Sequence, residues 1–169
     1  MTPAGDKVPL VTEHLAEPAT DHGTAILIGG KGILLRGRSG SGKSSLALRL
    51  LDDALFLGTP AFLVADDRVI LVREGERVMI TAVDSLRGLL EVRGLGLIEV
   101  DSVQKAPLDL VVDLVAPQAI ERYPEKDDLS TIVEGVSLPR LAIAELNPDG
   151  PAIIRAYFRA RPAPLEHFA

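Results

Sequence analysis

The chain has 169 residues, enough for one domain with a substantial core and too few for two comfortable ones. Its formal net charge of −6 leaves no basic surplus for phosphate neutralisation, which argues against a nucleic-acid binder. It contains no cysteine, which excludes a disulfide framework, a thiol nucleophile and a cysteine-based zinc site.

The first 21 residues are expected to be a lead-in segment, and residues 8–14 can also be interpreted as a short strand. They contain no long apolar run, so no signal or transit peptide is evident. The longest apolar runs of the chain are strand-sized, which predicts no membrane span. We therefore expect a cytoplasmic protein with neither nucleic acid nor membrane as a partner.

Two short apolar runs, residues 24–28 and 33–35, flank a glycine-rich turn and predict an antiparallel β-hairpin. The second run leads directly into a loop at residues 37–44. Residues 44–57 then carry apolar side chains at helical spacing, which predicts an amphipathic helix. Its apolar face is expected to consist of Leu46, Leu50, Ala54 and Leu57.

The loop at residues 37–44 reads GRSGSGKS and fits the Walker A pattern G-x-x-x-x-G-K-[ST]. Its glycines let backbone N–H groups cradle phosphate oxygens, Lys43 brings a charge to the β- and γ-phosphates, and the Ser44 hydroxyl can ligate Mg²⁺. The motif therefore predicts a nucleotide with its Mg²⁺, and it leaves the phosphate acceptor and the nucleotide preference open; ATP is the nucleotide expected for the leading hypothesis of a kinase. The expected nucleotide-binding residues are Gly37, Arg38, Ser39, Gly40, Ser41, Gly42, Lys43, Ser44 and Ser45.

The rest of the chain continues as an alternation of apolar runs and turns. The predicted elements are a strand at 61–65, a hairpin of 69–72 with 78–81, a segment 89–100 that is loop-like at its centre, a strand at 108–115, a short helix or turn at 116–123, a charged loop at 126–129, an apolar run of undecided type at 141–146, a helix at 153–158 and an irregular tail from 159 to 169.

Asp66 and Asp67 directly follow the predicted strand at 61–65. P-loop proteins place acidic groups at this position, where one carboxylate can orient metal-bound water and another can accept a hydroxyl proton. An ordinary Asp-Asp turn between two strands is the alternative. The position after the Walker A unit favours a functional pair.

Glu91 and Arg93 have the spacing that puts two side chains on one face of an extended segment. Near a nucleotide they could hold metal and phosphate charge, but from the residues alone a surface ion pair before a glycine turn is the favoured explanation. His22 at a loop–strand junction is by itself more typical of a surface group. His14 and His167 have no partners at ligand spacing.

Together these segments resemble the catalytic domain of the HPr kinase/phosphorylase family over roughly residues 20–145. His22 lies 15 residues before Gly37, as in that family, with the same hairpin between them. Residues 37–44 match its phosphate loop and residues 63–69, LVADDRV, match its acidic strand end. Residues 90–98, LEVRGLGLI, resemble its signature segment and are more specific than the loop.

The resemblance implies an α/β, P-loop-containing, mixed-sheet fold like that of phosphoenolpyruvate carboxykinase, with the antiparallel hairpin leading into the phosphate loop. It implies an enzyme that phosphorylates a serine of HPr, a phosphocarrier protein of the bacterial sugar phosphotransferase system. Many members also run the reverse reaction with inorganic phosphate, and members are commonly hexamers, so a homo-oligomer is expected.

The resemblance also implies roles for single residues. Asp66 becomes the general base towards the serine hydroxyl, and the acid in reverse. Arg140 is a weaker candidate for a phosphate or partner contact. The residues expected at the chemistry are Asp66, His22, Lys43 and Arg93, and those expected near the metal are Ser44, Asp67 and Glu91.

The sequence departs from the family pattern at three points, which affect the expected domain content and the expected reverse reaction. Family members have a further N-terminal domain, so residues 1–169 are expected to be a single kinase catalytic domain. Ser45 stands where an acidic residue is usual. Residues 126–140 are compressed, which predicts weak or absent phosphate-driven dephosphorylation. The open alternatives are a kinase of this fold with another acceptor and a nucleotide sensor that has lost catalysis.

Overall fold

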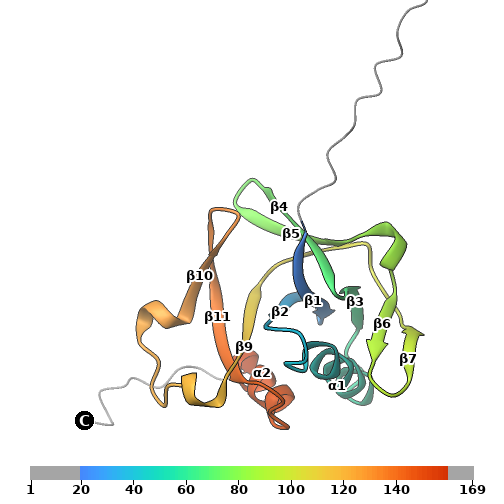
Figure 1. Ribbon diagram of the computed structural model, residues 1–169. Helices are drawn as coiled ribbons and strands as arrows, with labels where there is room; N and C mark the ends of the chain where they lie inside the picture. Colours follow the sequence, from blue (N-terminus) through green and yellow to red (C-terminus); the bar gives the residue numbers. More distant parts are fainter. Residues whose placement is uncertain (1–19, 160–169) are drawn as a thin grey trace, which may run out of the picture.

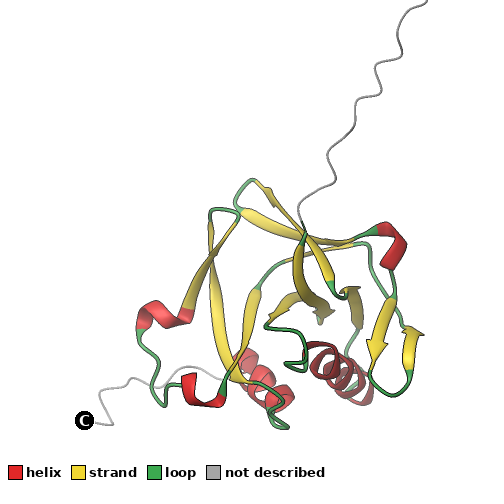
Figure 2. Ribbon diagram, viewed as in Figure 1, coloured by secondary structure: helices red, strands yellow, loops and turns green. Residues whose placement is uncertain are grey.

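A large mixed β-sheet organises residues 20–159, the part of the chain that the computed structural model describes (Figures 1 and 2). The sheet has nine strands in the order β10-β11-β9-β2-β1-β4-β5-β8, and β3 pairs with β1 outside this path. A separate two-stranded sheet is formed by β6 and β7. The sheet is mixed because β9 runs parallel to both β2 and β11, whereas the other strand pairs are antiparallel.

The elements have the following bounds. The strands are β1 (Asp21–Ile28), β2 (Lys31–Arg36), β3 (Ala61–Ala65), β4 (Arg68–Glu74), β5 (Arg77–Ala82), β6 (Leu89–Val92), β7 (Gly96–Glu99), β8 (Lys105–Pro107), β9 (Leu110–Val115), β10 (Ser130–Val133) and β11 (Val136–Ala144). The helices are α1 (Lys43–Phe56) and α2 (Gly150–Arg159), with 3-10 helices η1 (Asp84–Leu86), η2 (Pro117–Ala119) and η3 (Lys126–Leu129).

The hairpin that leads into the phosphate loop is confirmed. β1 and β2 pair antiparallel, with Ile26 opposite Ile33, and α1 begins at Lys43 directly after the loop. The predicted helix is therefore right to within one residue at each end. Leu57 is a correction: it caps the helix C-terminus and is 68% exposed, so it does not belong to the buried face.

The buried residues of strands β2 and β9 are a nearly continuous apolar run because both faces of the sheet are covered. Side chains alternate along β2, so Ile33 and Leu35 pack with α1 on one side while Leu34 packs in a second cluster on the other. β9 behaves the same way, with Val112 and Val111 in opposite clusters. This double burial fixes the end of β2, from which the phosphate loop departs.

The structure also tests the predictions for the rest of the chain. The hairpin of β4 and β5 and the helix at 153–158 are confirmed, and the loop-like centre of 89–100 is the turn between β6 and β7. Residues 126–129 form a 3-10 helix rather than a loop.

The undecided run at 141–146 belongs mostly to β11, and β10 was missed. Pro139 lies within β11 and made that strand hard to predict, because a proline normally argues against a paired strand. In the structure Pro139 pairs with Ser130 of the edge strand β10.

Two predicted segments, 8–14 and the tail beyond Arg159, lie outside the described residues. Within residues 20–159, neither α-helix has the length and hydropathy needed to cross a bilayer.

An Arg–Asp–Arg cluster joins the three parallel strands beside the phosphate loop. Asp113 on β9 accepts two hydrogen bonds from Arg36 on β2, at 2.7 and 3.0 Å, and one from Arg140 on β11 at 2.5 Å. Burial by itself raises the pKa of the Asp113 carboxyl, but the hydrogen bonds and charges of both arginines outweigh burial and hold this pKa below its ordinary value. The cluster therefore ties β11 and β9 to the strand that enters the loop.

We expect Asp113→Asn to lower the free energy of unfolding by about 1–3 kcal/mol at neutral pH, because two guanidinium groups lose their shared carboxylate. Since the folded-state pKa of Asp113 is depressed, its contribution is present above the unfolded-state pKa and is lost as pH falls through the folded-state value. The difference between wild type and variant should therefore shrink below about pH 4. Denaturant titrations at several pH values test this, with Asp84→Asn in the exposed pair with Arg87 as the control. An equal effect of both substitutions would contradict the prediction.

Candidate active site

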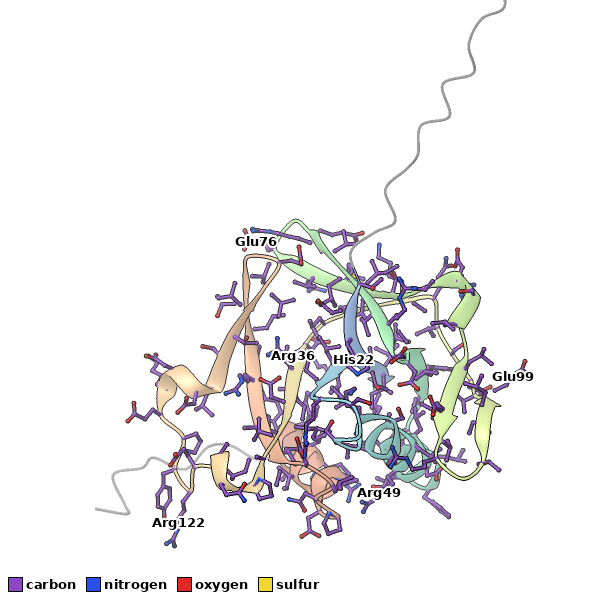
Figure 3. All side chains as sticks on the ribbon, in the orientation of Figure 1. His22, Arg36, Arg49, Glu76, Glu99 and Arg122 are labelled. Atoms are coloured by element: carbon purple, nitrogen blue, oxygen red, sulfur yellow. The ribbon has the colours of Figure 1, made fainter. Side chains whose placement is uncertain are left out.

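A pocket of about 220 Å³ opens where the start of β1, the phosphate loop, the N-terminus of α1, the end of β3 and the β6–β7 hairpin meet. In Figure 3 the labelled His22 lies close to this junction, at the start of β1. The residues that line the pocket are His22, Ser39, Gly40, Gly42, Lys43, Ser44, Ser45, Asp66, Asp67, Glu91, Arg93 and Leu146. All expected site residues except Gly37, Arg38 and Ser41 are thus brought together.

The loop geometry depends on glycine at two of its positions. Gly42 caps α1 with φ 97°, a left-handed conformation that other residues rarely adopt. At Gly37, a Cβ atom would lie 2.7 Å from the Ser41 hydroxyl and 3.0 Å from Leu114, so a side chain would not fit without rearrangement. The loop therefore delivers the free N–H groups and positive dipole end of α1 to the pocket, an arrangement suited to phosphate.

Lys43 is held within the loop. Its Nζ donates to the carbonyl oxygens of Gly37 and Arg38 at 2.9 and 3.1 Å and lies 3.0 Å from His22 Nε2. Burial lowers the pKa of the Lys43 amine, and the negative charges of Asp66 and Asp67 oppose this effect. The ammonium is thus a partly desolvated cation between the loop and the two carboxylates.

His22 links Lys43 to Asp67. An ammonium can only donate hydrogen bonds, so His22 Nε2 accepts from Lys43 and the ring proton is assigned to Nδ1. His22 Nδ1 lies 3.1 Å from the Asp67 carbonyl oxygen and 3.1 Å from its Oδ1. Asp67 has φ 65°, a strained conformation for a residue other than glycine, and its side chain is 67% exposed. The strained turn therefore presents a carboxylate to the pocket mouth.

Asp66 occupies a different environment from its neighbour. It is 7% exposed, and its Oδ1 accepts from Thr24 Oγ1 at 2.6 Å. Ser44 Oγ lies 3.1 and 3.3 Å from the two carboxylate oxygens, and the Glu91 backbone N–H donates to Oδ2 at 3.1 Å. These contacts orient the Asp66 carboxylate next to the Walker A serine.

Glu91 and Arg93 both line the pocket, but they do not lie on one face of a single strand as their spacing suggested. Only Glu91 lies on strand β6; Arg93 follows in the turn to β7. The β6–β7 hairpin thus adds an acidic and a basic side chain to the pocket wall, and it is anchored there by the Glu91 N–H bond to Asp66.

The side chains of Arg140 and Arg38, which do not line the pocket, pair with other residues. Arg140 is engaged with Asp113 and the Asp128 carbonyl, and its contact with a phosphate or a partner stays a prediction. The Arg38 side chain points to Glu145, with hydrogen bonds of 2.8 and 2.7 Å, and this pairing raises the pKa of Arg38 and lowers that of Glu145.

Sequence reasoning missed two residues of the site, Thr24 and Leu146. Thr24 is fully buried and bonds to Asp66; its spacing of two from His22 on one strand places both on the same face, a signal that could have identified it. No local signal marks Leu146, which reaches the pocket from the loop after β11.

The fold and pocket together define a mixed α/β protein in which a glycine-rich loop, between a strand and a helix, shares one pocket with carboxylates from β3's end and from β6. Its family follows from comparison with known proteins. The chain belongs to the HPr serine kinase C-terminal domain family, whose model matches residues 13–146. The resemblance predicted from the sequence is thereby confirmed.

Curated relatives carry the name HPr kinase/phosphorylase. The protein from Leptothrix cholodnii is 34% identical over 134 residues, which cover 75% of this chain and 39% of that protein. The one from Caldicellulosiruptor bescii is 31% identical over 143 residues, covering 79% of this chain and 44% of that protein. The chain therefore spans about two fifths of the length of these relatives.

Among solved structures, the Hpr(Ser) kinase/phosphatase from Coxiella burnetii superposes with a TM-score of 0.69 over 83% of this chain and 88% of that one. At 24% sequence identity this match shows the shared fold. The likeness to phosphoenolpyruvate carboxykinase stays a prediction.

Proposed function

We propose that this chain is an ATP- and Mg²⁺-dependent kinase that phosphorylates a serine of HPr or of an HPr-like phosphocarrier protein. The observation that carries the proposal is the convergence of Lys43, Ser44, Asp66 and Glu91 on one pocket in a member of this family. Residues 1–169 are proposed to act as one kinase catalytic domain. A homo-oligomer is still an expectation of the resemblance.

The donor groups of the pocket fit a nucleotide and its metal. Free N–H groups at the start of α1 and the Lys43 ammonium suit the phosphates, and Ser44 Oγ together with the carboxylates of Asp67 and Glu91 in the same pocket offers hard oxygen ligands. Residues 20–159 contain no ready-made cluster of three metal-ligating side chains. This agrees with Mg²⁺, which proteins usually hold through one or two carboxylates together with substrate phosphates. When bound, Mg²⁺ would neutralise charge on the phosphate oxygens.

We assign the general base to Asp66 and place Asp67 and Glu91 near the metal. The hydrogen bonds from Thr24 and Ser44 hold one rotamer of Asp66, so its carboxylate can accept the proton of an acceptor hydroxyl without first reorienting. Lys43 and Arg93 supply positive charge for the transferred phosphoryl group. His22 contacts Lys43 through Nε2 and Asp67 through Nδ1, and it thereby holds these two residues in fixed positions relative to each other.

The direct test is to incubate the full chain with labelled ATP and purified HPr-type carriers. The carriers are used as wild type and with the candidate serine replaced by alanine. Label on the wild-type carrier alone supports the proposal. ADP formation that does not depend on any carrier points to another acceptor, and ATP binding without turnover points to a nucleotide sensor; either result contradicts the proposal.

We expect phosphate-driven dephosphorylation to be weak. The compressed segment 126–140 folds into η3, β10 and part of β11, and its Arg140 is committed to Asp113 rather than to the pocket. The measurement supplies phosphoserine-HPr and millimolar phosphate without ATP and follows pyrophosphate release. Pyrophosphate formed as fast as the forward reaction would show that this segment is dispensable and the enzyme fully bifunctional.

A further inference from the structure

The geometry points to a nucleoside subsite on the segment that follows β11, with the side chain of Leu146 as the surface against which the base packs. This inference rests on the proposed function, because it extends the phosphate site of the same pocket. The ligand class is a nucleoside triphosphate, and the new element is the residue that receives its nucleoside end.

The direction of the nucleotide follows from the two sides of the pocket. In a Walker A loop the lysine reaches the β- and γ-phosphates, so the transferred end lies beside Lys43 and the carboxylates. The nucleoside end must then leave on the other side of the loop. Leu146 and Ser45 line the pocket, and together with Gly42 they also line a neighbouring cavity of about 100 Å³ into which it can extend.

Leu146 is fixed to the phosphate loop by its backbone. Its N–H donates to the Ser41 carbonyl at 3.1 Å, and a Cβ atom on Gly42 would lie 3.0 Å from its Cδ2. The preceding Glu145 holds the Arg38 side chain with two hydrogen bonds. A surface bound to the loop in this way keeps a constant position relative to the phosphates.

The backbone conformation of Leu146 lowers the stability of the fold, and the burial of its side chain does not compensate for this cost. Its φ of 56° lies in the left-handed region, which costs a leucine stability, yet its side chain is 72% exposed and returns little by burial. Strained residues of this kind concentrate at ligand sites. A base that covers Leu146 would bury the apolar surface that folding leaves in water.

The neighbouring cavity supplies polar groups for the sugar. Ser41 is a fully buried residue of the cavity wall, and its hydroxyl has no hydrogen-bond partner within residues 20–159. Arg49, on α1 and labelled in Figure 3, and Asn147 line the same cavity. An unpartnered buried hydroxyl is rare, and a ribose hydroxyl is a suitable partner.

The test compares the affinities of full-length variants for ATP and for inorganic tripolyphosphate by calorimetry. Leu146→Gly and Leu146→Ala should each raise the Kd for ATP about five- to tenfold, as expected for loss of one apolar contact. The Kd for tripolyphosphate should stay within about twofold, because it has no base to lose. Leu146→Gly, which relieves the left-handed strain, should leave Tm unchanged or raise it. Glu134→Gly relieves a comparable φ of 49° in the remote β10–β11 turn and should leave both Kd values unchanged.

Two outcomes would overturn the inference. If both leucine variants keep the wild-type Kd for ATP while tripolyphosphate still binds, Leu146 only braces the loop and the phosphate site stands. If wild type binds neither ATP nor tripolyphosphate, the proposed function itself fails, and the nucleoside subsite fails with it.

Discussion

Lys43→Ala is expected to lower kcat/KM for phosphoryl transfer by about a thousandfold or more, and to weaken ATP binding. The reason is electrostatic: the variant keeps the backbone cradle but loses the charge at the β- and γ-phosphates, in a partly desolvated position where such a charge counts most. Because burial already depresses the pKa of this amine, its removal should not destabilise the fold. Steady-state kinetics with the carrier protein and a melting curve give the two readouts.

Lys31, on the β1–β2 hairpin that leads into the loop, provides a matched control. Lys31 lies at the far end of β2, is 57% exposed and pairs with Asp109 at 3.5 Å, so Lys31→Ala should leave turnover unchanged. A Lys43→Ala variant with near-normal turnover would remove the Walker A loop from the mechanism.

Asp66→Asn should lower kcat by about 10²–10⁴-fold, the usual contribution of a general base, with little change in the Kd for ATP. The substitution is nearly isosteric, but the amide cannot take up the hydroxyl proton. It also turns an NH₂ group towards one of the donors that Asp66 accepts from, Thr24, Ser44 or the Glu91 N–H. The Thr24 and Ser44 hydroxyls can turn to accept from this NH₂ group, but the loss of charge-assisted hydrogen bonds in a buried site should still cost about 1–3 kcal/mol of stability, so activity is compared well below Tm.

Magnesium titration separates the two carboxylate roles. If high Mg²⁺ restores the activity of Asp66→Asn, this carboxylate acts through the metal and the assignment of the base is wrong. Under the proposed assignment, Asp67→Asn rather than Asp66→Asn should respond to added Mg²⁺. The exposed Asp52 on α1 provides the control substitution, Asp52→Asn, for which no kinetic change is expected.

The hairpin, loop and first helix could be predicted from the sequence because their signals are local. Apolar residues alternate or recur within a few positions, and the loop motif is contiguous. The structure confirms β1, β2 and α1 with nearly the expected bounds. Around Pro139 in β11 the local signals left the element type undecided, since pairing with β9 and β10 determined the strand.

The composition of the pocket was only partly open to sequence reasoning. Patterns alone left His22 as a surface group and Glu91 with Arg93 as a surface ion pair, and the family resemblance was needed to select them. The structure supplies the physical connection: His22 meets Asp67 across 45 positions of sequence, and the Glu91 N–H meets Asp66 across 25.

By itself the sequence determined the phosphate loop, its flanking strand and helix, and the family to which the chain belongs. Tertiary structure alone decided the bond of Thr24 to Asp66, the sharing of Asp113 by Arg36 and Arg140, and the approach of the Glu145–Leu146 segment to the loop. Glu145 and Arg38 are 107 positions apart. Such contacts depend on the spatial order of the strands in the sheet, and neither periodicity nor a contiguous motif indicates that order.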